Sequence, residues 1–250
     1  MFTMKYTIYP IAQGTYWIDK SMIEYLNNAY NQPFHMTHGF FALRDENGEV
    51  TLVDTGAPSA EEIRDKALPF KAADDLISAE EALQKAGIDP EEVKTVILTN
   101  LLWQHSWNLH LFRNAEIYVQ RAEIEHAVTP YPHEKEAYCM TENTFRKGWM
   151  RGILQIRTID GDAAVKPGLR VIRTPGHTPG SQTVLADTAE GTYALVGDWA
   201  YTPNNWENHK ATGDTLDTIK WFQSYDKIMS CGAKILPTHL DSVYERKVYG

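Results

Sequence analysis

Residues 94–105 read Lys-Thr-Val-Ile-Leu-Thr-Asn-Leu-Leu-Trp-Gln-His, a β-branched, apolar segment that runs into a more polar end. The stretch from Ala79 to Gly87 before it has a helical pattern, and a turn at 88–90 separates the two. A short apolar run bounded by turn residues predicts a buried strand from Lys94 to Thr99. This strand would deliver Asn100 to His105 into a loop.

Three later segments repeat this arrangement of an apolar strand, a Gly or Pro, and then a His or Asp. The predicted strands are Val171–Thr174 before Gly176 and His177, Tyr193–Val196 before Gly197 and Asp198, and Lys234–Leu236 before Pro237 and His239. Loops at strand ends on a rigid sheet are where proteins usually present catalytic groups. We therefore expect the four loops to meet in one site.

Local signals place the neighbouring elements. The pattern Ser78-Ala79-Glu80-Glu81 is a capping box, which predicts a helix from Ala79 that ends at Gly87. A tight hairpin is predicted at Asn47-Gly48, between two apolar runs, and it brings Asp54 to the site. The segment Ala122–Trp149 carries the least pattern, and we expect it to supply a lid over the substrate or a dimer contact.

The ordered set of motifs resembles a known family. It consists of Val53-Asp54-Thr55-Gly56, the loop at 100–105, Gly176-His177-Thr178-Pro179-Gly180, Gly197-Asp198 and Thr238-His239. This order resembles the metallo-β-lactamase superfamily, and within it the N-acyl-homoserine lactonase group. The closer likeness rests on Val119 to Glu123, Asp198 to Thr202 and a helical pattern from Leu216 to Met229. The resemblance runs from about Tyr6 to Tyr249, and it implies one α/β domain over residues 1–250, a four-layer αββα sandwich.

The run at 100–105 departs from the family pattern His-x-His-x-Asp-His. In the family, its first two His bind one metal with the His of the Gly-His-x-Pro-Gly loop. The Asp and third His bind a second metal with the last His, and the late Asp bridges both. Carried over by position, the first two His become Asn100 and Leu102, and the Asp becomes Gln104. The other four ligands match and are His105, His177, Asp198 and His239.

The ligands that remain predict one metal ion. The first position keeps only His177 and Asp198, because a leucine cannot coordinate. The second keeps His105, Asp198 and His239, and Gln104 offers a neutral amide oxygen. Two His and a carboxylate are an accepted set for a single zinc or iron with open positions. We expect one divalent ion, zinc in the first place and manganese or iron as alternatives, held weakly enough to be absent from some preparations.

The resemblance also implies roles for residues outside the ligand set. With its first metal gone, His177 is free to act as a general base or to bind the substrate. Tyr201 matches the tyrosine that lies over the substrate carbonyl in the lactonase group, where its hydroxyl would stabilise an oxyanion. We expect Asp54 to fix the loops by hydrogen bonds rather than to bind the ion.

Aromatic residues near these loops suggest the kind of substrate. Trp103 and Trp107 lie in or beside the altered run, and Trp199 and Trp206 closely follow Asp198. Each of them is as readily explained by packing in the core. Together they predict a pocket for an aromatic or apolar ring, with Asn100 as a further substrate contact.

Composition limits the partners and the location. A net charge of −9 and a pI near 5.5 argue against nucleic acid, which needs a basic face. No apolar stretch approaches the roughly 18 residues of a membrane helix, and Met1–Lys20 lacks a signal-peptide pattern. Two cysteines do not make a disulfide scaffold, which favours the cytoplasm. The composition does not decide whether the chain forms a homodimer.

The sequence thus predicts a hydrolase that acts on a small cyclic ester, amide or related carbonyl compound, aromatic or heterocyclic, with a single or weakly bound metal. Two alternatives remain. One is an enzyme that works without metal, using His105, His177 and Asp198 as acid-base groups. The other is a non-catalytic protein that binds a small molecule. The joint presence of His177, Asp198, Tyr201 and His239 disfavours the second, because burying polar groups costs free energy.

Overall fold

The computed structural model describes residues 4–68 and 75–250. The strands are β1 Tyr6–Asp19, β2 Pro33–Asp45, β3 Val50–Val53, β4 Thr95–Ile97, β5 Glu116–Gln120, β6 Ile156–Ile159, β7 Ala163–Lys166, β8 Leu169–Arg173, β9 Gln182–Thr188, β10 Gly191–Leu195 and β11 Lys234–Leu236. The α-helices are α1 Ala60–Asp65, α2 Ala79–Lys85, α3 Trp103–Ser106, α4 Arg121–Val128, α5 Pro203–Glu207, α6 Thr218–Ser230 and α7 Asp241–Glu245. The 3-10 helices are η1 Lys20–Met22, η2 Pro90–Glu92, η3 Leu109–Leu111, η4 Pro132–Glu134, η5 Gly148–Gln155 and η6 Gly197–Trp199.

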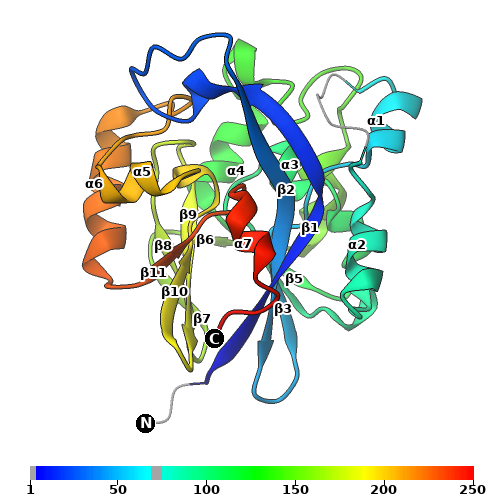
Figure 1. The fold of residues 1–250 in the computed structure, drawn as a ribbon. Helices are drawn as coiled ribbons and strands as arrows, with labels where there is room; N and C mark the ends of the chain where they lie inside the picture. The colour runs from blue at the N-terminus through cyan, green and yellow to red at the C-terminus, as the bar shows by residue number, and fades with distance from the viewer. Residues whose placement is uncertain (1–3, 69–74) are drawn as a thin grey trace.

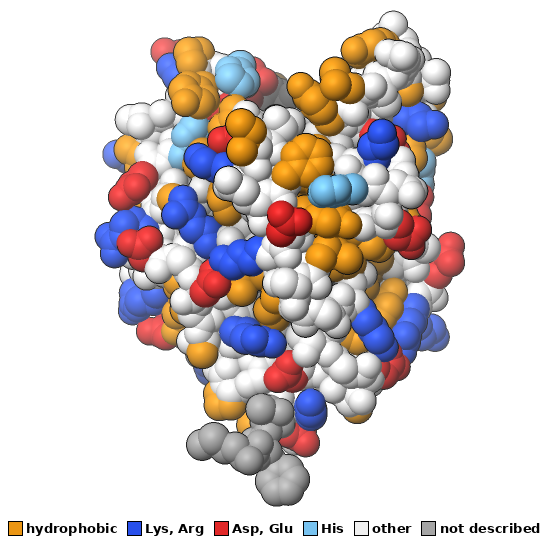
Figure 2. All heavy atoms as spheres, turned by 90° about the vertical axis from the view of Figure 1, so that its left-hand side faces the viewer, with side chains coloured by type: hydrophobic (Ala, Val, Ile, Leu, Met, Phe, Trp, Pro, Cys, Tyr) orange, Lys and Arg blue, Asp and Glu red, His pale blue; other side chains and the backbone are white. Residues whose placement is uncertain are grey.

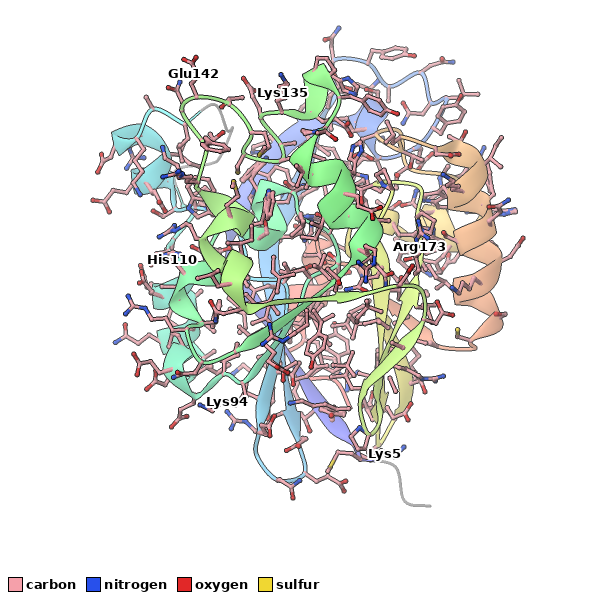
Figure 3. All side chains as sticks on the ribbon, turned by 180° about the vertical axis from the view of Figure 1, so that it is seen from behind. Lys5, Lys94, His110, Lys135, Glu142 and Arg173 are labelled. Carbon is pink, nitrogen blue, oxygen red and sulfur yellow. The ribbon has the colours of Figure 1, made fainter. Side chains whose placement is uncertain are left out.

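Two sheets pack face to face between layers of helices (Figure 1). One hydrophobic cluster joins Phe41 and Ile97 of the first sheet to Val184 and Leu195 of the second. Helix α2 covers the outer face of the first sheet, and α6 covers that of the second, as the view from behind also shows (Figure 3). This arrangement is the αββα sandwich that the resemblance implied.

The first sheet has the order β1-β2-β3-β4-β5-β6. Its long β1 and β2 pair antiparallel, with a register shift between Ala12 and Gly14, and β2 pairs antiparallel with β3. From β3 to β6 all pairings are parallel. Because parallel strands end at one edge, the loops after β3 and β4 open side by side.

The second sheet has the order β11-β10-β9-β8-β7. Strands β7 to β10 pair antiparallel, and β10 and β11 pair parallel. The parallel pair brings the residues after Leu195 and after Leu236 to the same edge. This register is what places Asp198 next to His239.

The local sequence signals agree with the structure where they are strongest. Ser78 Oγ accepts a hydrogen bond from Glu81 N at the start of α2, as the capping box predicts. The hairpin at Asn47-Gly48 joins β2 to β3, with Gly48 at φ +85°. The predicted strand over 94–99 is shorter, β4, and all three of its residues are buried.

The segment Ala122–Trp149 has more structure than its sequence suggested. It holds most of α4 together with η4, and Tyr138 and Trp149 are buried in the main core. Trp149 Nε1 donates a hydrogen bond to the carbonyl of Tyr138 at 2.9 Å. Much of this segment is therefore part of the domain's packing, and its role as a lid or dimer contact stays a prediction.

The surface over α6 is partly apolar. Ile219 and Phe222 are exposed on this helix, and hydrophobic side chains gather on the face that carries it (Figure 2). A membrane span is not found among the helices of the described residues, none of which is both long and apolar enough. The first three residues of the stretch Met1–Lys20 lie outside the described ranges.

Candidate active site

Five loops meet at the edge where the two sheets end. Each follows a strand, and together they carry Asp54 after β3, His105 after β4, His177 after β8, Asp198 after β10 and His239 after β11. All five side chains are buried. The convergence predicted from the strand ends is therefore present.

His105 connects two carboxylates. Its Nδ1 lies 2.8 Å from Asp54 Oδ2, and its Nε2 lies 2.7 Å from Asp198 Oδ2. The ring sits on the short helix α3, whose first turn follows directly on the loop from β4. Asp54 thus holds one side of the imidazole and leaves the other directed at Asp198.

His239 and His177 approach the same carboxylate. His239 Nε2 is 3.1 Å from Asp198 Oδ1, while its Nδ1 is 2.9 Å from the Thr37 carbonyl. His177 Nε2 is 3.3 Å from Asp198 Oδ2. The close approaches of His239 Nε2, His177 Nε2 and Asp198 Oδ1 lack hydrogen-bond geometry, so these buried atoms have no partner. Three imidazoles therefore turn Nε2 towards one carboxylate.

The charges around Asp198 stabilise positive charge on the histidines. Burial by itself lowers the pKa of His105, but the Asp198 and Asp54 carboxylates outweigh it and raise that pKa to about 10. For His177, burial is again opposed, here by Asp214 and Asp198, and the pKa rises to about 9. Burial works to raise the pKa of Asp198, yet the imidazoles of His105 and His177 hold it well below its usual value. The negative potential of these carboxylates would stabilise either a proton on the histidines or a metal cation among them.

Asp54 fixes the backbone of the site, as the sequence led us to expect. Its Oδ1 accepts a hydrogen bond from Thr99 N at 2.7 Å, and its Oδ2 accepts one from Thr99 Oγ1 at 2.8 Å. Asp54 itself adopts φ +64°, in the left-handed region that few non-glycine residues occupy. The carboxylate thus ties the end of β4 to the end of β3 and orients His105.

Asn100 occupies the first position of the altered run. Its Nδ2 donates to Asp198 Oδ2 at 3.0 Å, and its Oδ1 accepts from Leu102 N at 2.9 Å. The side chain is buried. We predicted Asn100 as a substrate contact, but the structure commits both its oxygen and one of its amide hydrogens to the protein.

Glu123 of α4 joins the loop after β4 to the loop after β8. Its carboxylate accepts hydrogen bonds from Leu101 N at 3.0 Å, Thr178 Oγ1 at 2.7 Å and Gly180 N at 3.0 Å, and from the hydroxyl of Tyr138 at 3.1 Å. A Cβ on Gly180 would lie 2.2 Å from Glu123 N, so only glycine permits this approach. The buried carboxylate locks the His105 loop to the His177 loop.

Tyr201 and a further carboxylate flank His177. The Tyr201 hydroxyl donates to Asp214 Oδ2 at 2.6 Å, and Asp214 Oδ1 lies 3.5 Å from His177 Nδ1. Burial, together with Asp198 and Asp214, raises the pKa of Tyr201 well above its usual value, so the hydroxyl keeps its proton. In the structure, this hydroxyl proton points to Asp214 and not to the space beside Asp198.

An aromatic group stands beside His239. Tyr16 and His38 stack with ring centroids 3.9 Å apart, and Trp103 lies 5.4 Å from the His38 ring. His38 in turn meets His239 edge-on at 5.7 Å. His38 is buried, its Nε2 has no hydrogen-bond partner, and burial holds its pKa well below its usual value. A neutral imidazole and two large rings therefore border the site.

The other three tryptophans predicted to line the pocket are placed in packing clusters. Trp199 stacks on Trp221 at 5.0 Å and, with Trp206, belongs to the cluster between the second sheet and α6. Trp107 is fully buried with Leu68 and Cys139. Nearness to the site in sequence thus did not predict orientation, and Trp103 alone of the four has a ring contact with the group around His239.

The donor set fits one metal ion. His105, Asp198 and His239 each offer a ligand atom, and these atoms lie within 4.8 Å of one another. Both histidines are oriented through Nδ1 by an acceptor, Asp54 or the Thr37 carbonyl, as metal-bound histidines usually are. Gln104 is half-buried on α3, and no hydrogen bond links it to Asp198 in the part of the chain described. Its contact with an ion stays a prediction.

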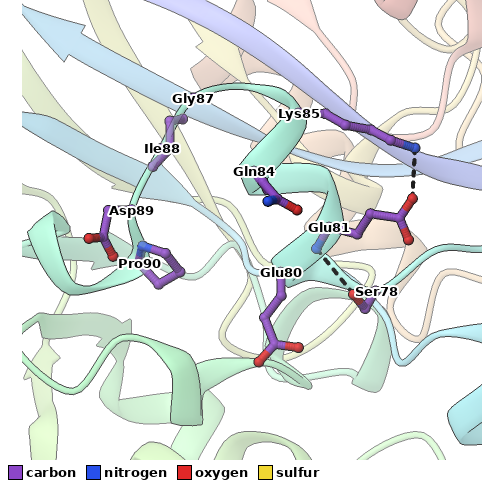
Figure 4. A pocket seen from close by; sticks show the side chains of 9 residues that line it. All are labelled: Ser78, Glu80, Glu81, Gln84, Lys85, Gly87, Ile88, Asp89 and Pro90. Atoms are coloured by element: carbon purple, nitrogen blue, oxygen red, sulfur yellow. Dashed lines mark hydrogen bonds and ion pairs between the residues drawn. The ribbon is translucent and has the colours of Figure 1, made fainter.

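A broad surface hollow lies along α2, away from these loops (Figure 4). Three of its polar side chains are used locally, because Ser78 caps the helix and Lys85 pairs with Glu81 at 2.9 Å. The hollow therefore offers no unsatisfied group comparable to those around Asp198.

Sequence reasoning missed four residues of the site. Glu123 stood in a segment used only for the resemblance, and Asp214 belongs to no motif. Tyr16 lies in β1, where the sequence shows no motif, and His38 lies in β2, which entered only through the predicted hairpin to β3. Apart from the place of Glu123 in the resemblance, no local sequence pattern marked these residues as part of the site.

Comparison with known proteins agrees with the fold. The family profile described as the metallo-beta-lactamase superfamily matches residues 40–239. An N-acyl homoserine lactonase of Bacillus sp. is 33% identical over 179 residues, 67% of this chain and 66% of that protein. An N-acyl homoserine lactonase of Bacillus cereus is 29% identical over 215 residues, 80% of this chain and 78% of that protein. The chain thus aligns with just under two thirds of the first relative.

Solved structures share the fold. A quorum-quenching N-acyl homoserine lactone lactonase superposes with a TM-score of 0.76 at 24% identity, covering 96% of this chain and 94% of that one. An N-acyl homoserine lactone hydrolase, solved with its product N-hexanoyl-L-homoserine at the catalytic metal centre, gives 0.77 at 23% identity, with 98% and 96% covered.

Proposed function

Because the chain belongs to the metallo-β-lactamase superfamily, we propose that it is a metal-dependent hydrolase of a small cyclic ester, amide or related carbonyl compound. The observation that carries the proposal is the arrangement of three buried imidazoles around Asp198, with Nε2 atoms 2.7 to 3.3 Å from its oxygens. A packed core has no need of such a costly cluster. The lactonase activity of the relatives supports the same reaction class.

His105, Asp198 and His239 would hold a single divalent ion, zinc in the first place and manganese or iron as alternatives. When bound, the ion would polarise the substrate carbonyl and acidify a water molecule. Asn100 and Leu102 stand where the family carries two further histidines, which is why we propose one ion and not two.

The remaining residues position the substrate and move protons. Hydrolysis adds the hydroxyl of water to the carbonyl carbon and returns a proton to the leaving ring oxygen or nitrogen. His177, buried with Nε2 facing Asp198, is the group we propose for this proton transfer. Tyr201 would stabilise the oxyanion after its hydroxyl turns from Asp214 to the substrate, an interaction worth roughly 3 kcal/mol.

For the substrate class we propose a compact aromatic or heterocyclic compound. Tyr16, His38 and Trp103 supply flat surfaces beside His239, and the single free Nε2 of His38 offers one polar contact. Flat rings with few polar groups suit a flat, apolar substrate.

A paired substrate assay tests the function. Zinc-loaded protein is given N-hexanoyl homoserine lactone and, in parallel, benzo-fused lactones and lactams, with the ring-opened products quantified by liquid chromatography and mass spectrometry. We expect turnover of a benzo-fused substrate in the ordinary enzyme range, about 1 to 10³ per second, and poor turnover of the acyl lactone. The opposite ranking would replace our substrate class with that of the relatives, and no turnover of either would remove the hydrolase proposal.

One observation favours a second candidate, an acid-base enzyme that needs no metal. His105 and Asp198 already form a direct 2.7 Å hydrogen bond, so the cluster holds together through its own contacts. Full activity in protein shown by elemental analysis to be free of metal would select this candidate.

A further inference from the structure

The turn between α5 and α6 places a carboxylate at the rear of the proposed site. Asp214 lies in this turn, and its side chain is 19% exposed. Its Oδ2 accepts the Tyr201 hydroxyl at 2.6 Å, and its Oδ1, buried and without a hydrogen-bond partner, lies 3.5 Å from His177 Nδ1. One carboxylate thus faces both residues to which we assign proton transfer and oxyanion stabilisation.

The turn is held in place on both sides. Gly213 N donates to the Met22 carbonyl at 2.9 Å, and a Cβ on Gly213 would lie 2.0 Å from the Ser21 carbonyl oxygen. On the other side, Asp217 N donates to the Gly176 carbonyl at 2.9 Å, which ties the turn to the His177 loop. Asp214 is therefore fixed relative to His177 and does not sit on a free loop.

We propose that Asp214 is a positioning residue, which keeps the hydrogen of the His177 imidazole on Nδ1 and holds the Tyr201 ring beside it. The negative charge of a carboxylate behind Nδ1 favours the hydrogen on that nitrogen, which leaves Nε2, the nitrogen that faces Asp198, free to exchange a proton with the substrate. His105 has a closer version of this arrangement, with Asp54 in hydrogen-bond contact behind Nδ1 at 2.8 Å, whereas Asp214 approaches His177 at 3.5 Å without hydrogen-bond geometry. Each of the two histidines thus has a carboxylate behind Nδ1, supplied by a different element.

The inference rests on the proposed function only for its kinetic consequence. Replacing the carboxylate by an amide lets an N–H group face His177 Nδ1, which favours the hydrogen on Nε2, so the nitrogen that faces Asp198 can no longer accept a proton. We expect Asp214→Asn to lower kcat by about 10- to 100-fold, the usual cost of losing an orienting group, with KM changed much less. The matched control is Asp217→Asn, which removes the same charge three residues away and keeps an N-cap for α6.

Nuclear magnetic resonance of the zinc-loaded, full-length protein with ¹⁵N-labelled histidine gives a readout independent of activity, with the His177 signals assigned through His177→Gln. We expect a hydrogen on His177 Nδ1 in the wild type and in Asp217→Asn, and its loss in Asp214→Asn. A wild-type Nδ1 without hydrogen, or an unchanged Nδ1 hydrogen in Asp214→Asn, would overturn the proposal.

If Asp214→Asn does not fold, Asp214→Ser replaces it. If the wild type hydrolyses no substrate, the proposed function fails while the spectra still decide the role of Asp214.

Discussion

The side-chain amide of Asn100 donates a hydrogen bond to Asp198 Oδ2 at 3.0 Å. In the family that the chain resembles, a metal-binding histidine stands at this position. The amide is neutral and meets the carboxylate directly, so one lone pair of Asp198 is bound within the protein. Asn100 therefore stabilises the Asp198 carboxylate directly, without an ion between them.

This contact leads to a prediction on metal content. Protein incubated with excess Zn²⁺ and desalted should retain at most about one ion per chain, because three strong ligands make one site. The triple variant Asn100→His, Leu102→His and Gln104→Asp, which restores the family's run, should bind about two. Elemental analysis of both proteins measures this, and two tightly held ions in the wild type would refute the loss of the first position.

Individual ligand variants locate the ion. His239→Ala and Asp198→Ala should each abolish metal retention and activity together, because each removes one of only three strong ligands. His177→Ala should retain the ion and lose roughly 10²-fold or more in turnover, the scale of an acid-base group. If His177→Ala loses the ion as completely as His239→Ala, then His177 is a ligand and the ion lies nearer the first position.

Zinc binding should depend on pH. The pKa of His105 is raised to about 10 by its two carboxylates, so its imidazole is protonated at neutral pH before an ion binds. A ligand histidine must be neutral, and binding therefore releases this proton. Affinity should rise as pH increases towards that pKa, by up to about tenfold per unit for one proton. Titration calorimetry at pH 6, 7 and 8 in buffers of different ionisation enthalpy checks it, and a pH-independent affinity without proton release would contradict the prediction.

The buried carboxylate of Glu123 should matter greatly for stability. In the wild type, Thr178 Oγ1 and Gly180 N donate to the Glu123 carboxylate. Glu123→Gln can place an amide N–H group against these two donors. We expect the free energy of unfolding to fall by about 3 kcal/mol or more, since two buried donors lose their acceptor and meet an N–H group in its place.

The control for this stability test is Glu125→Gln. This residue is exposed on the same helix, α4, and should change the free energy of unfolding by no more than about 0.5 kcal/mol. Urea unfolding followed by circular dichroism compares the two variants, and equal losses would show that the Glu123 network is not specially stabilising.

The sequence by itself determined the elements that depend on interactions between residues close together in the chain. The capping box at Ser78, the hairpin at Asn47-Gly48 and the strand before Asn100 are set by residues a few positions apart, and all three are found in the structure. The strand ends that carry His177, Asp198 and His239 follow the same local logic. They meet in one place because β8, β10 and β11 run in the same direction, so that their ends share one edge of the second sheet.

Tertiary structure decided what depends on distant residues. Asp214 meets His177 across 37 positions, and Thr178 reaches Glu123 across 55, separations over which no periodic pattern carries information. Trp199 stacks on Trp221 of α6, in the cluster between this helix and the second sheet, and its orientation depends on a residue 22 positions away. Which side chain faces the reaction is a matter of packing among elements far apart in the chain, and it is fixed only when the sheets and helices come together.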